Sequence, residues 1–285
     1  MFDIIIGNPP YNKNGGIATG NTIYQFFTKK ALNEWLKVDG YLLFVHPPGW
    51  RRPCNKRSKF LKMFELMTQQ NQMLYLEIHD IKDGQKIFKA GTRYDWYLIE
   101  KKPKYKKTIV IDEEGTRDEI DLSEWRSWFP NSNFTEIKKI LAKDENERCP
   151  IIYDTSAYET RKKWVSKEKS SEFKYPLIHS TPKSGVRYMY SKVNDKGFFG
   201  ISKVIFGDSG IYNPIIDMEG KYGMTQHSMA IKVDNLEEAK NISKAIESER
   251  FNKIIKSTLF SLYAIEWRIF REFKKDFYKK YLYNV

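Results

Sequence analysis

Four consecutive residues with clear chemical potential, Asn8, Pro9, Pro10 and Tyr11, directly follow a short apolar run at residues 2–6. That run is typical of a buried strand that enters a tight turn. The two prolines hold φ near about −65° and lack backbone N–H donors, so the loop is rigid and its carbonyls point one way. The Asn8 side-chain oxygen and the Pro9 carbonyl could therefore accept hydrogen bonds from one amino group, beside the aromatic face of Tyr11.

Such a loop suits methylation of an aromatic amine. The exocyclic amine of adenine or cytosine is a poor nucleophile because its lone pair is delocalised into the ring. Acceptors around the amino hydrogens would hold the nitrogen nearer sp³ and direct its lone pair at a methyl donor. The base must leave the duplex to reach them, and stacking on Tyr11 would contribute about 1–3 kcal/mol. The alternative is a Pro-Pro turn that only ends a strand.

With the preceding strand and Gly7, these residues resemble the N6-adenine and N4-cytosine DNA methyltransferases, whose signature is Asn-Pro-Pro-Tyr and its variants. The form at residues 2–12 looks most like adenine enzymes of the gamma order, such as those of Type IIG restriction–modification systems. The resemblance implies methyl transfer from S-adenosylmethionine to the N6 amine of adenine in duplex DNA. It also implies that Phe88 contacts the flipped base from its other side, with a core or hairpin role as the alternative.

The family places its glycine-rich S-adenosylmethionine loop, and an acidic residue for the cofactor ribose, on strands before this motif. Only seven residues precede Asn8, and no Gly-x-Gly follows a strand elsewhere. We therefore expect most of the cofactor site on a missing half supplied by a second polypeptide, with a truncated or degenerate gene product as the alternative. The strand at 2–6 would then be an apolar open edge that something must cover.

Strands and helices alternate over the first hundred residues, which predicts an α/β layer with a mostly parallel sheet. We interpret it as the C-terminal half of a class I methyltransferase sheet, with ligand loops at the strand C-termini. A helix follows Asn21-Thr22, and another spans 58–68. The predicted strands, of which the fourth is antiparallel to the third, are 2–6, 41–45, 73–78 and 96–99.

Three regions follow from this pattern. Residues 1–102 form a partial methyltransferase catalytic domain, and residues 103–150 form a bridging region. Residues 151–285 form an α+β target-recognition, DNA-binding domain, because parts of it resemble the C-terminal domain of the same enzymes. Its clearest predicted elements are strands at 203–206 and 228–233 and a helix from 236 to about 251.

A basic run beside the predicted ligand edge favours contact with DNA phosphates, with a solvated helix start as the alternative. The net charge of +13 also favours a polyanionic partner, unless it only reflects a Lys-rich proteome. At the same edge, we interpret His46 as a packing residue and Trp50 as a core residue. The alternative for Trp50 is that its ring wedges into the opened duplex. The DNA-binding candidates are Arg51, Arg52, Lys56, Arg57 and Lys59.

The sequence argues against several other classes of protein. Two distant cysteines and four scattered histidines predict no metal site and a reducing compartment. Asp208, Glu219 and Lys221 match the spacing of metal-dependent nucleases only loosely. No stretch approaches the ~20 apolar residues of a membrane span. We expect a soluble, cytoplasmic protein with no membrane partner.

Three alternative functions stay open. The first is a non-catalytic DNA-recognition or specificity subunit of a restriction–modification system, which would bind DNA without cofactor. The second is a Type IIG endonuclease fragment, which would cleave DNA with Mg²⁺. The third is methylation of a protein glutamine amide, which related Asn-Pro-Pro-Tyr enzymes perform and which the basic charge argues against.

Overall fold

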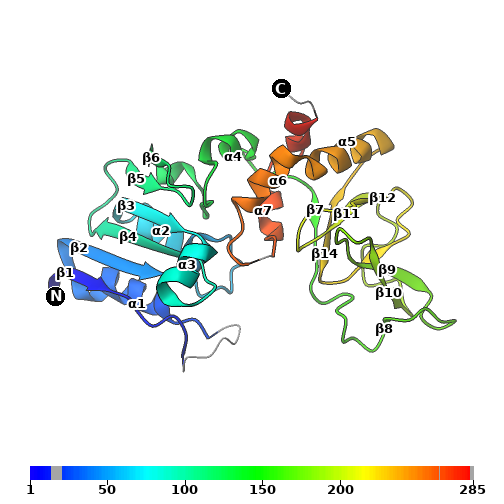
Figure 1. Cartoon of the computed structure of the whole chain (residues 1–285), viewed down its shortest axis with the longest axis horizontal. Helices are drawn as coiled ribbons and strands as arrows, with labels where there is room; N and C mark the ends of the chain where they lie inside the picture. The colour runs from blue at the N-terminus through cyan, green and yellow to red at the C-terminus, as the bar shows by residue number, and fades with distance from the viewer. Residues whose placement is uncertain (14–20, 263, 283–285) are drawn as a thin grey trace. The chain divides into compact units, whose positions relative to one another are not determined.

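The structure is a computed structural model that describes residues 1–13, 21–262 and 264–282 (Figure 1). It divides into two compact units: residues 1–132 together with 260–262, and the other described residues from 133 onward. The division falls inside the predicted bridging region 103–150. The start of that region completes the sheet of the first unit, and its end opens the second unit. None of the helices in the described ranges is long and apolar enough to cross a membrane.

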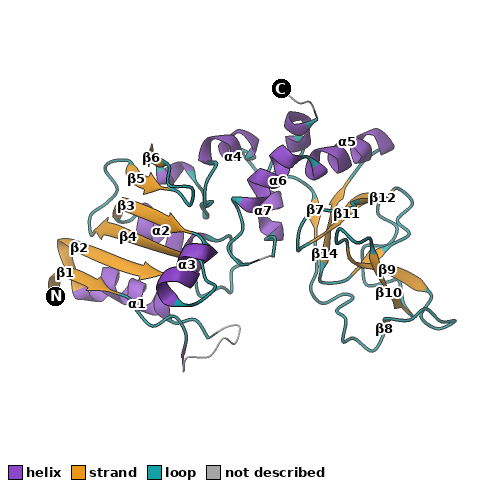
Figure 2. Cartoon of the chain, viewed as in Figure 1, coloured by secondary structure: helices purple, strands orange, loops and turns teal. Residues whose placement is uncertain are grey.

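The first unit is built on a six-stranded mixed sheet in the order β1-β2-β4-β3-β5-β6 (Figure 2). β1 pairs parallel to β2, and β3 pairs parallel to β5. β4 is antiparallel to both of its neighbours, which confirms the predicted pairing with β3. The α/β fold class is confirmed, but the predicted mostly parallel sheet is wrong, because β2 with β4, β3 with β4 and β5 with β6 all pair antiparallel. The strands are β1 (Phe2–Gly7), β2 (Leu36–His46), β3 (Gln72–His79), β4 (Tyr94–Glu100), β5 (Thr108–Ile111) and β6 (Arg117–Ile120).

The helices of this unit are short and depart from the sequence pattern in two places. The predicted helix 58–68 begins only at Met63, and an unpredicted helix lies between the strands predicted at 73–78 and 96–99. That helix starts where the Asp80 side chain accepts a hydrogen bond from the backbone N–H of Asp83. The helices are α1 (Tyr24–Lys30), the π-helical η2 (Ala31–Trp35), η3 (Pro48–Arg51), α2 (Met63–Thr68), α3 (Ile81–Phe88) and η4 (Leu122–Glu124).

The two faces of this sheet differ in how well they are covered. η2 packs against β2 and α2 packs against β3, and the side chains beneath them, such as Leu42 and Ile99, are fully buried. On the other face, β1 leaves Ile4 and Ile6 60% and 70% exposed. Their cross-strand neighbours Tyr41 and Leu43 are also partly exposed. The sheet therefore has one buried face and one open apolar face, and β1 forms its open edge.

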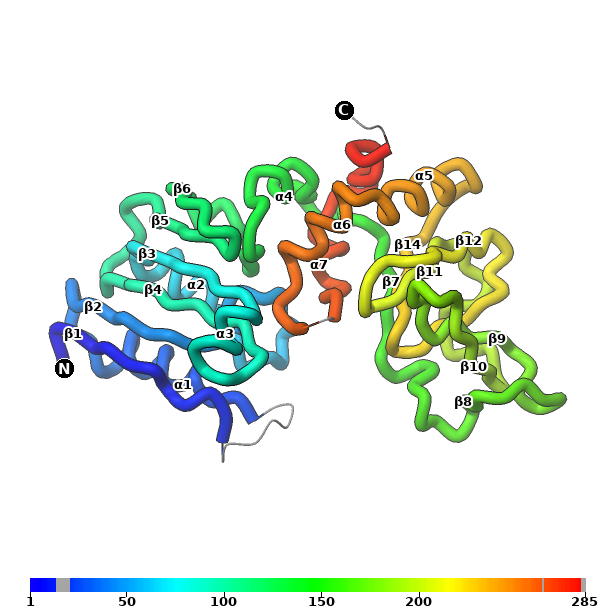
Figure 3. Tube along the Cα trace, in the orientation of Figure 1, coloured from blue at the N-terminus to red at the C-terminus, as the bar shows by residue number. Residues whose placement is uncertain are grey.

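The second unit holds two four-stranded sheets, with strand orders β12-β11-β14-β7 and β13-β9-β10-β8. The helix predicted from 236 to about 251 is divided at Ser248, whose side chain accepts a hydrogen bond from the N–H of Phe251 and begins a new helix. Figure 3 follows the chain through these elements. The strands are β7 (Ile151–Ile152), β8 (Val165–Ser166), β9 (Tyr175–Ser180), β10 (Arg187–Ser191), β11 (Lys203–Gly207), β12 (Ile215–Asp217), β13 (Gly223–Met224) and β14 (Ser228–Lys232). The helices are α4 (Phe134–Ile140), α5 (Leu236–Glu247), α6 (Glu249–Lys256), α7 (Trp267–Glu272) and η5 (Phe277–Tyr281).

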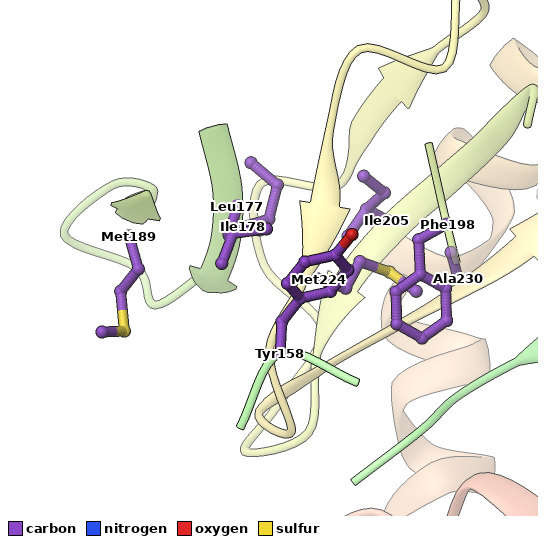
Figure 4. Close-up of a cluster of buried hydrophobic side chains, with 8 residues drawn as sticks. All are labelled: Tyr158, Leu177, Ile178, Met189, Phe198, Ile205, Met224 and Ala230. Carbon is purple, nitrogen blue, oxygen red and sulfur yellow. The ribbon is translucent and has the colours of Figure 1, made fainter. Parts of the chain in front are cut away.

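A cluster of buried apolar side chains joins the two sheets of the second unit. Leu177 and Ile178 on β9 and Ile205 on β11 are completely buried in it, together with Met224. Figure 4 shows the ring of Tyr158 among these side chains. A shared core of this kind makes the two small sheets one folding unit.

Candidate functional site

The Asn8–Tyr11 loop leaves the carboxyl end of β1, beside the carboxyl end of β2. Pro9 is buried, Tyr11 is half-buried, and Asn8 and Pro10 are exposed. The Tyr11 carbonyl accepts a hydrogen bond of 3.0 Å from the N–H of Ile23, at the start of α1. The loop is thus held at both ends, and the side chain of Asn8 remains accessible.

Aromatic rings surround Tyr11 edge to face. Its ring centroid lies 6.3 Å from Tyr24 and 6.3 Å from Phe88, with an interplanar angle of 75° in both pairs. Phe88 is itself perpendicular to Tyr94 at 4.9 Å. Because Phe88 and Tyr11 are perpendicular, they do not form two parallel walls for one base. The sequence placed Tyr11 and Phe88 on opposite sides of one base. In the structure the two rings are neighbours, but they meet edge to face.

The phenol of Tyr11 lies in a desolvated setting. Burial raises its pKa, and the neighbouring Asn8 side chain partly opposes that rise. The hydroxyl oxygen is buried and makes no hydrogen bond of normal geometry with the described residues. Tyr11 is therefore neutral at physiological pH, and its hydroxyl is a polar group still able to donate to a ligand.

Behind this loop, a buried polar network surrounds His46. Its Nε2 lies 2.8 Å from the hydroxyl of Tyr97 and 3.3 Å from that of Thr28. Its Nδ1 lies 3.0 Å from the Pro47 carbonyl oxygen. Because a carbonyl only accepts, Nδ1 carries the proton and Nε2 accepts from a hydroxyl. Complete burial lowers the pKa of His46 to about 4, so the ring is neutral.

His46 supports Tyr24, which lies in the helix predicted after Asn21-Thr22. The two rings lie 4.5 Å apart, and Phe60 packs on Tyr24 at 5.4 Å. The Tyr24 hydroxyl accepts a hydrogen bond of 3.2 Å from the N–H of Gly49. A Cβ at Gly49 would clash with that hydroxyl, so the turn after β2 requires glycine. Tyr24 in turn contacts Tyr11, which makes it part of the floor of the site.

Arg51 does not have the role that the sequence suggested. Its side chain is 0% exposed and forms a bidentate ion pair with Asp95, at 2.8 and 2.9 Å. Its remaining nitrogen donates to the carbonyls of Phe129 and Pro130 and to the side chain of Asn131. The predicted phosphate contact by Arg51 is therefore wrong, because every donor group of the guanidinium is used inside the first unit.

The rest of the basic run stays accessible. Arg52, Lys56, Arg57 and Lys59 are exposed in the turns between η3 and α2. Trp50, by contrast, is buried: its Nε1 donates to Asp95 at 2.8 Å, and its ring stacks on Phe64. Trp50 is a core residue, as the sequence favoured, and it is not placed to wedge into DNA.

The residues with nuclease-like spacing do not form a metal cluster in the second unit. Asp208 lies 3.3 Å from the His227 ring, while Glu219 and Lys221 form an exposed ion pair of 2.9 Å. Across the described residues, no group of three His, Cys, Asp or Glu side chains is arranged to hold a metal ion. The geometry gives the nuclease alternative no support.

The described residues do not fit a complete site for S-adenosylmethionine. The carboxyl end of β1 offers the Asn8 loop, but no glycine-rich turn follows any of the described strands in the Gly-x-Gly form. The Asn8–Tyr11 loop, by contrast, presents groups that suit an acceptor amine.

Comparison with known proteins agrees with this fold. Residues 1–88 match a family model described as Eco57I restriction-modification methylase. No curated protein matches the chain. Among solved structures, the chain is similar to the Type IIL restriction-modification enzyme MmeI in complex with DNA, with 9% identity over 92% of this chain and 45% of that one, and a TM-score of 0.51. It is also similar to a modification subunit of a putative type I restriction enzyme from Vibrio vulnificus, with 12% identity over 54% of this chain and 35% of that one, and a TM-score of 0.30.

The chain spans less than half the length of each of these solved structures. At such low identity the likeness concerns the fold, which is α/β and methyltransferase-like. The family match is confined to the first 88 residues.

Proposed function

We propose that this chain supplies the target-base side of a DNA methyltransferase that transfers a methyl group from S-adenosylmethionine to the N6 amine of adenine. The observation that carries the proposal is the Asn8–Tyr11 loop at the carboxyl end of β1. Its rigid backbone, exposed amide and half-buried aromatic ring provide what an extrahelical amino base needs: acceptors for its amine and a surface for its ring.

The role of each residue follows from its chemistry. The Asn8 amide oxygen and the Pro9 carbonyl accept the two amino hydrogens, which draws the nitrogen lone pair out of the ring system. Tyr11 stacks on the base. Phe88, perpendicular to Tyr11, meets that base edge to face. Neutral His46 acts on no proton in this scheme: it holds Tyr24, and Tyr24 holds Tyr11.

The methyl donor, whose sulfonium supplies an electrophilic methyl group, would be held mainly outside the described residues. The open face of the first sheet supports this arrangement. Ile4 and Ile6 are more than half exposed, and the backbone groups along the outer edge of β1 have no partner strand among the described residues. An apolar sheet edge of this kind binds another strand readily. We propose that the cofactor-binding half of the sheet covers it, supplied by a second polypeptide.

The second unit would select the DNA sequence. Its two small sheets and apolar core form a separate body with its own interior. The exposed Arg52, Lys56, Arg57 and Lys59 of the first unit would contact phosphates near the flipped base. Duplex DNA is thus the proposed macromolecular partner, and no metal takes part in this chemistry.

The proposal is tested by incubating the chain, both purified alone and co-expressed with a protein that carries the cofactor half, with radiolabelled S-adenosylmethionine and mixed duplex DNA. The Asn8→Ala variant removes the amine acceptor, and Asn194→Ala is a matched control because Asn194 is exposed in the second unit. Label that appears with the unchanged chain and Asn194→Ala, but not with Asn8→Ala, would support the proposal. Digestion of the DNA to nucleosides then separates N6-methyladenine from N4-methylcytosine.

Label only in the co-expressed preparation would agree with a cofactor half on a second polypeptide. Absence of label in both preparations, with DNA binding retained, would refute the proposal and favour a DNA-recognition subunit. Label on a protein glutamine in place of DNA would refute the proposed substrate.

A further inference from the structure

A groove on the second unit is separate from the Asn8 loop and has a charge pattern of its own. It encloses about 810 Å³ and is open to solvent. Its floor is β7, which is the edge strand of its sheet, and one wall is α7, which packs on β7 (Figure 1). Its lining includes four cationic side chains, those of Arg148, Lys196, Lys232 and Arg271.

The carboxylates in this groove are engaged elsewhere. Asp154 accepts hydrogen bonds from the N–H groups of Ser156 and Ala157, so it stabilises its own turn. Glu145 pairs with Arg148 at 3.3 Å. By contrast, Lys232 and Arg271 are exposed, and no acidic side chain among the described residues lies within 4.0 Å of either. The groove therefore has an uncompensated positive charge.

The frame of the groove is held by backbone hydrogen bonds. The N–H of Cys149 donates to the carbonyl of Phe273 at 2.8 Å, and the N–H of Lys232 donates to the carbonyl of Pro150 at 3.1 Å. These bonds fix the segment before β7 to the end of α7 on one side and to β14 on the other. Arg271 and Lys232 are thus presented from rigid elements.

One donor atom in the wall of the groove lacks an acceptor. The buried Nε of Arg148 makes no hydrogen bond with the described residues, although its terminal nitrogens pair with Glu145 and Glu272. An unsatisfied buried donor costs about 1–3 kcal/mol, and an anionic oxygen is the acceptor type that best relieves this cost. The aromatic wall is already filled, because Trp267 stacks on Tyr153 and the guanidinium of Arg268 lies over its ring. The groove therefore favours an anion over a stacked base.

We infer that this groove binds the phosphodiester backbone of duplex DNA, with Lys232 and Arg271 as the two phosphate contacts. The volume exceeds what a single small anion needs, and the open side lets an extended polyanion pass. Contacts to phosphates position a protein on DNA without reading its sequence. The inference rests on the proposed function and adds to it the surface by which the second unit holds its partner.

The test is a salt titration of binding to a fluorescent duplex, followed by anisotropy, with Lys232→Gln/Arg271→Gln. The matched control is Lys240→Gln/Lys244→Gln, which removes the same charge from exposed positions on α5 outside the groove. Loss of two phosphate contacts should reduce the slope of log K against log salt by about 2 and weaken binding roughly tenfold or more at about 0.1 M salt. The control should keep the slope of the unchanged chain. A charge-keeping variant, Lys232→Arg/Arg271→Lys, should keep most of the affinity.

Three outcomes would overturn the inference. Equal losses in the groove variant and the α5 control would show that only net charge matters. An unchanged slope in the groove variant would place DNA elsewhere while leaving the proposed function intact. No binding of duplex DNA by the unchanged chain would remove the proposed DNA partner itself, and this inference with it.

Discussion

The buried ion pair between Arg51 and Asp95 allows a sharp test of the difference between a structural and a DNA-binding arginine. In Arg51→Met, a side chain of similar length keeps most of the packing and removes all the donors. Asp95, which is 0% exposed, would keep only the N–H of Trp50 as a partner. The acceptors at Phe129, Pro130 and Asn131 would lose their donor at the same time.

The expected loss in the free energy of unfolding is about 3–5 kcal/mol, since removal of one partner leaves an uncompensated buried charge. Most domains have only about 5–15 kcal/mol of stability. The double variant Arg51→Met/Asp95→Asn should be more stable than Arg51→Met alone, because no charge is then stranded. Arg57→Met, at an exposed position, should change stability by about 0.5 kcal/mol or less.

Hydrogen exchange of the β4 amides, measured by mass spectrometry, reports on the stability of the first unit separately from that of the second. Faster exchange of β4 in Arg51→Met, with partial recovery in the double variant, is the expected result. Duplex binding of the folded fraction should keep its salt dependence. If Arg51→Met left β4 exchange unchanged and made the salt dependence shallower, Arg51 would be a phosphate contact and the reasoning from its burial would be refuted.

Three further predictions follow from the same contacts. Burial lowers the pKa of His46 from 6.5 to about 4, so the unfolded state binds a proton first as the pH falls. The free energy of unfolding should therefore fall by up to about 3 kcal/mol between pH 6.5 and pH 4. Urea unfolding of His46→Gln should show a weaker pH dependence than the unchanged chain, and an equal pH dependence would contradict the prediction. Lys56→Gln/Arg57→Gln should reduce the salt slope of duplex binding by about 2, whereas an unaltered slope would exclude this turn from the DNA interface. Lys203→Met would remove the ion-pair partner that lies 2.7 Å from the buried Asp217, and should destabilise the second unit by about 3–5 kcal/mol. Hydrogen exchange of the β11 amides should then accelerate while the β4 amides stay protected. Faster exchange in both strands would argue against independent units.

Much of the first unit was predictable from local pattern. The apolar run before Asn8, the run at 41–45 and those at 73–78 and 96–99 all became strands of one sheet. Their apolar composition is a local property, so a sequence displays it directly. β5 and β6 were missed, since both are four residues long and lie in a stretch of charged residues. β5 lies between β3 and β6, and β6 forms the edge of the sheet, so both strands depend on pairing that a local pattern does not show.

The helix α3 was missed for a related reason. Its eight residues contain Gly84, which lowers helix propensity. The glycine is required because a Cβ there would clash with the backbone carbonyl of Thr92, in the chain that returns toward β4. A tertiary approach therefore selects a residue that, judged locally, argues against the helix.

The sequence by itself determined the rigid acceptor loop at Asn8–Tyr11 and the strand that presents it, because proline geometry and apolar runs act over a few residues. Only the tertiary structure decided what surrounds that loop. Tyr24 and Phe88 meet Tyr11 from separate helices, and Arg51, from a run that reads as uniformly basic, is drawn inside by Asp95, 44 positions away. Burial and pairing depend on which distant groups converge, and the spacing of residue types along a chain does not carry that information.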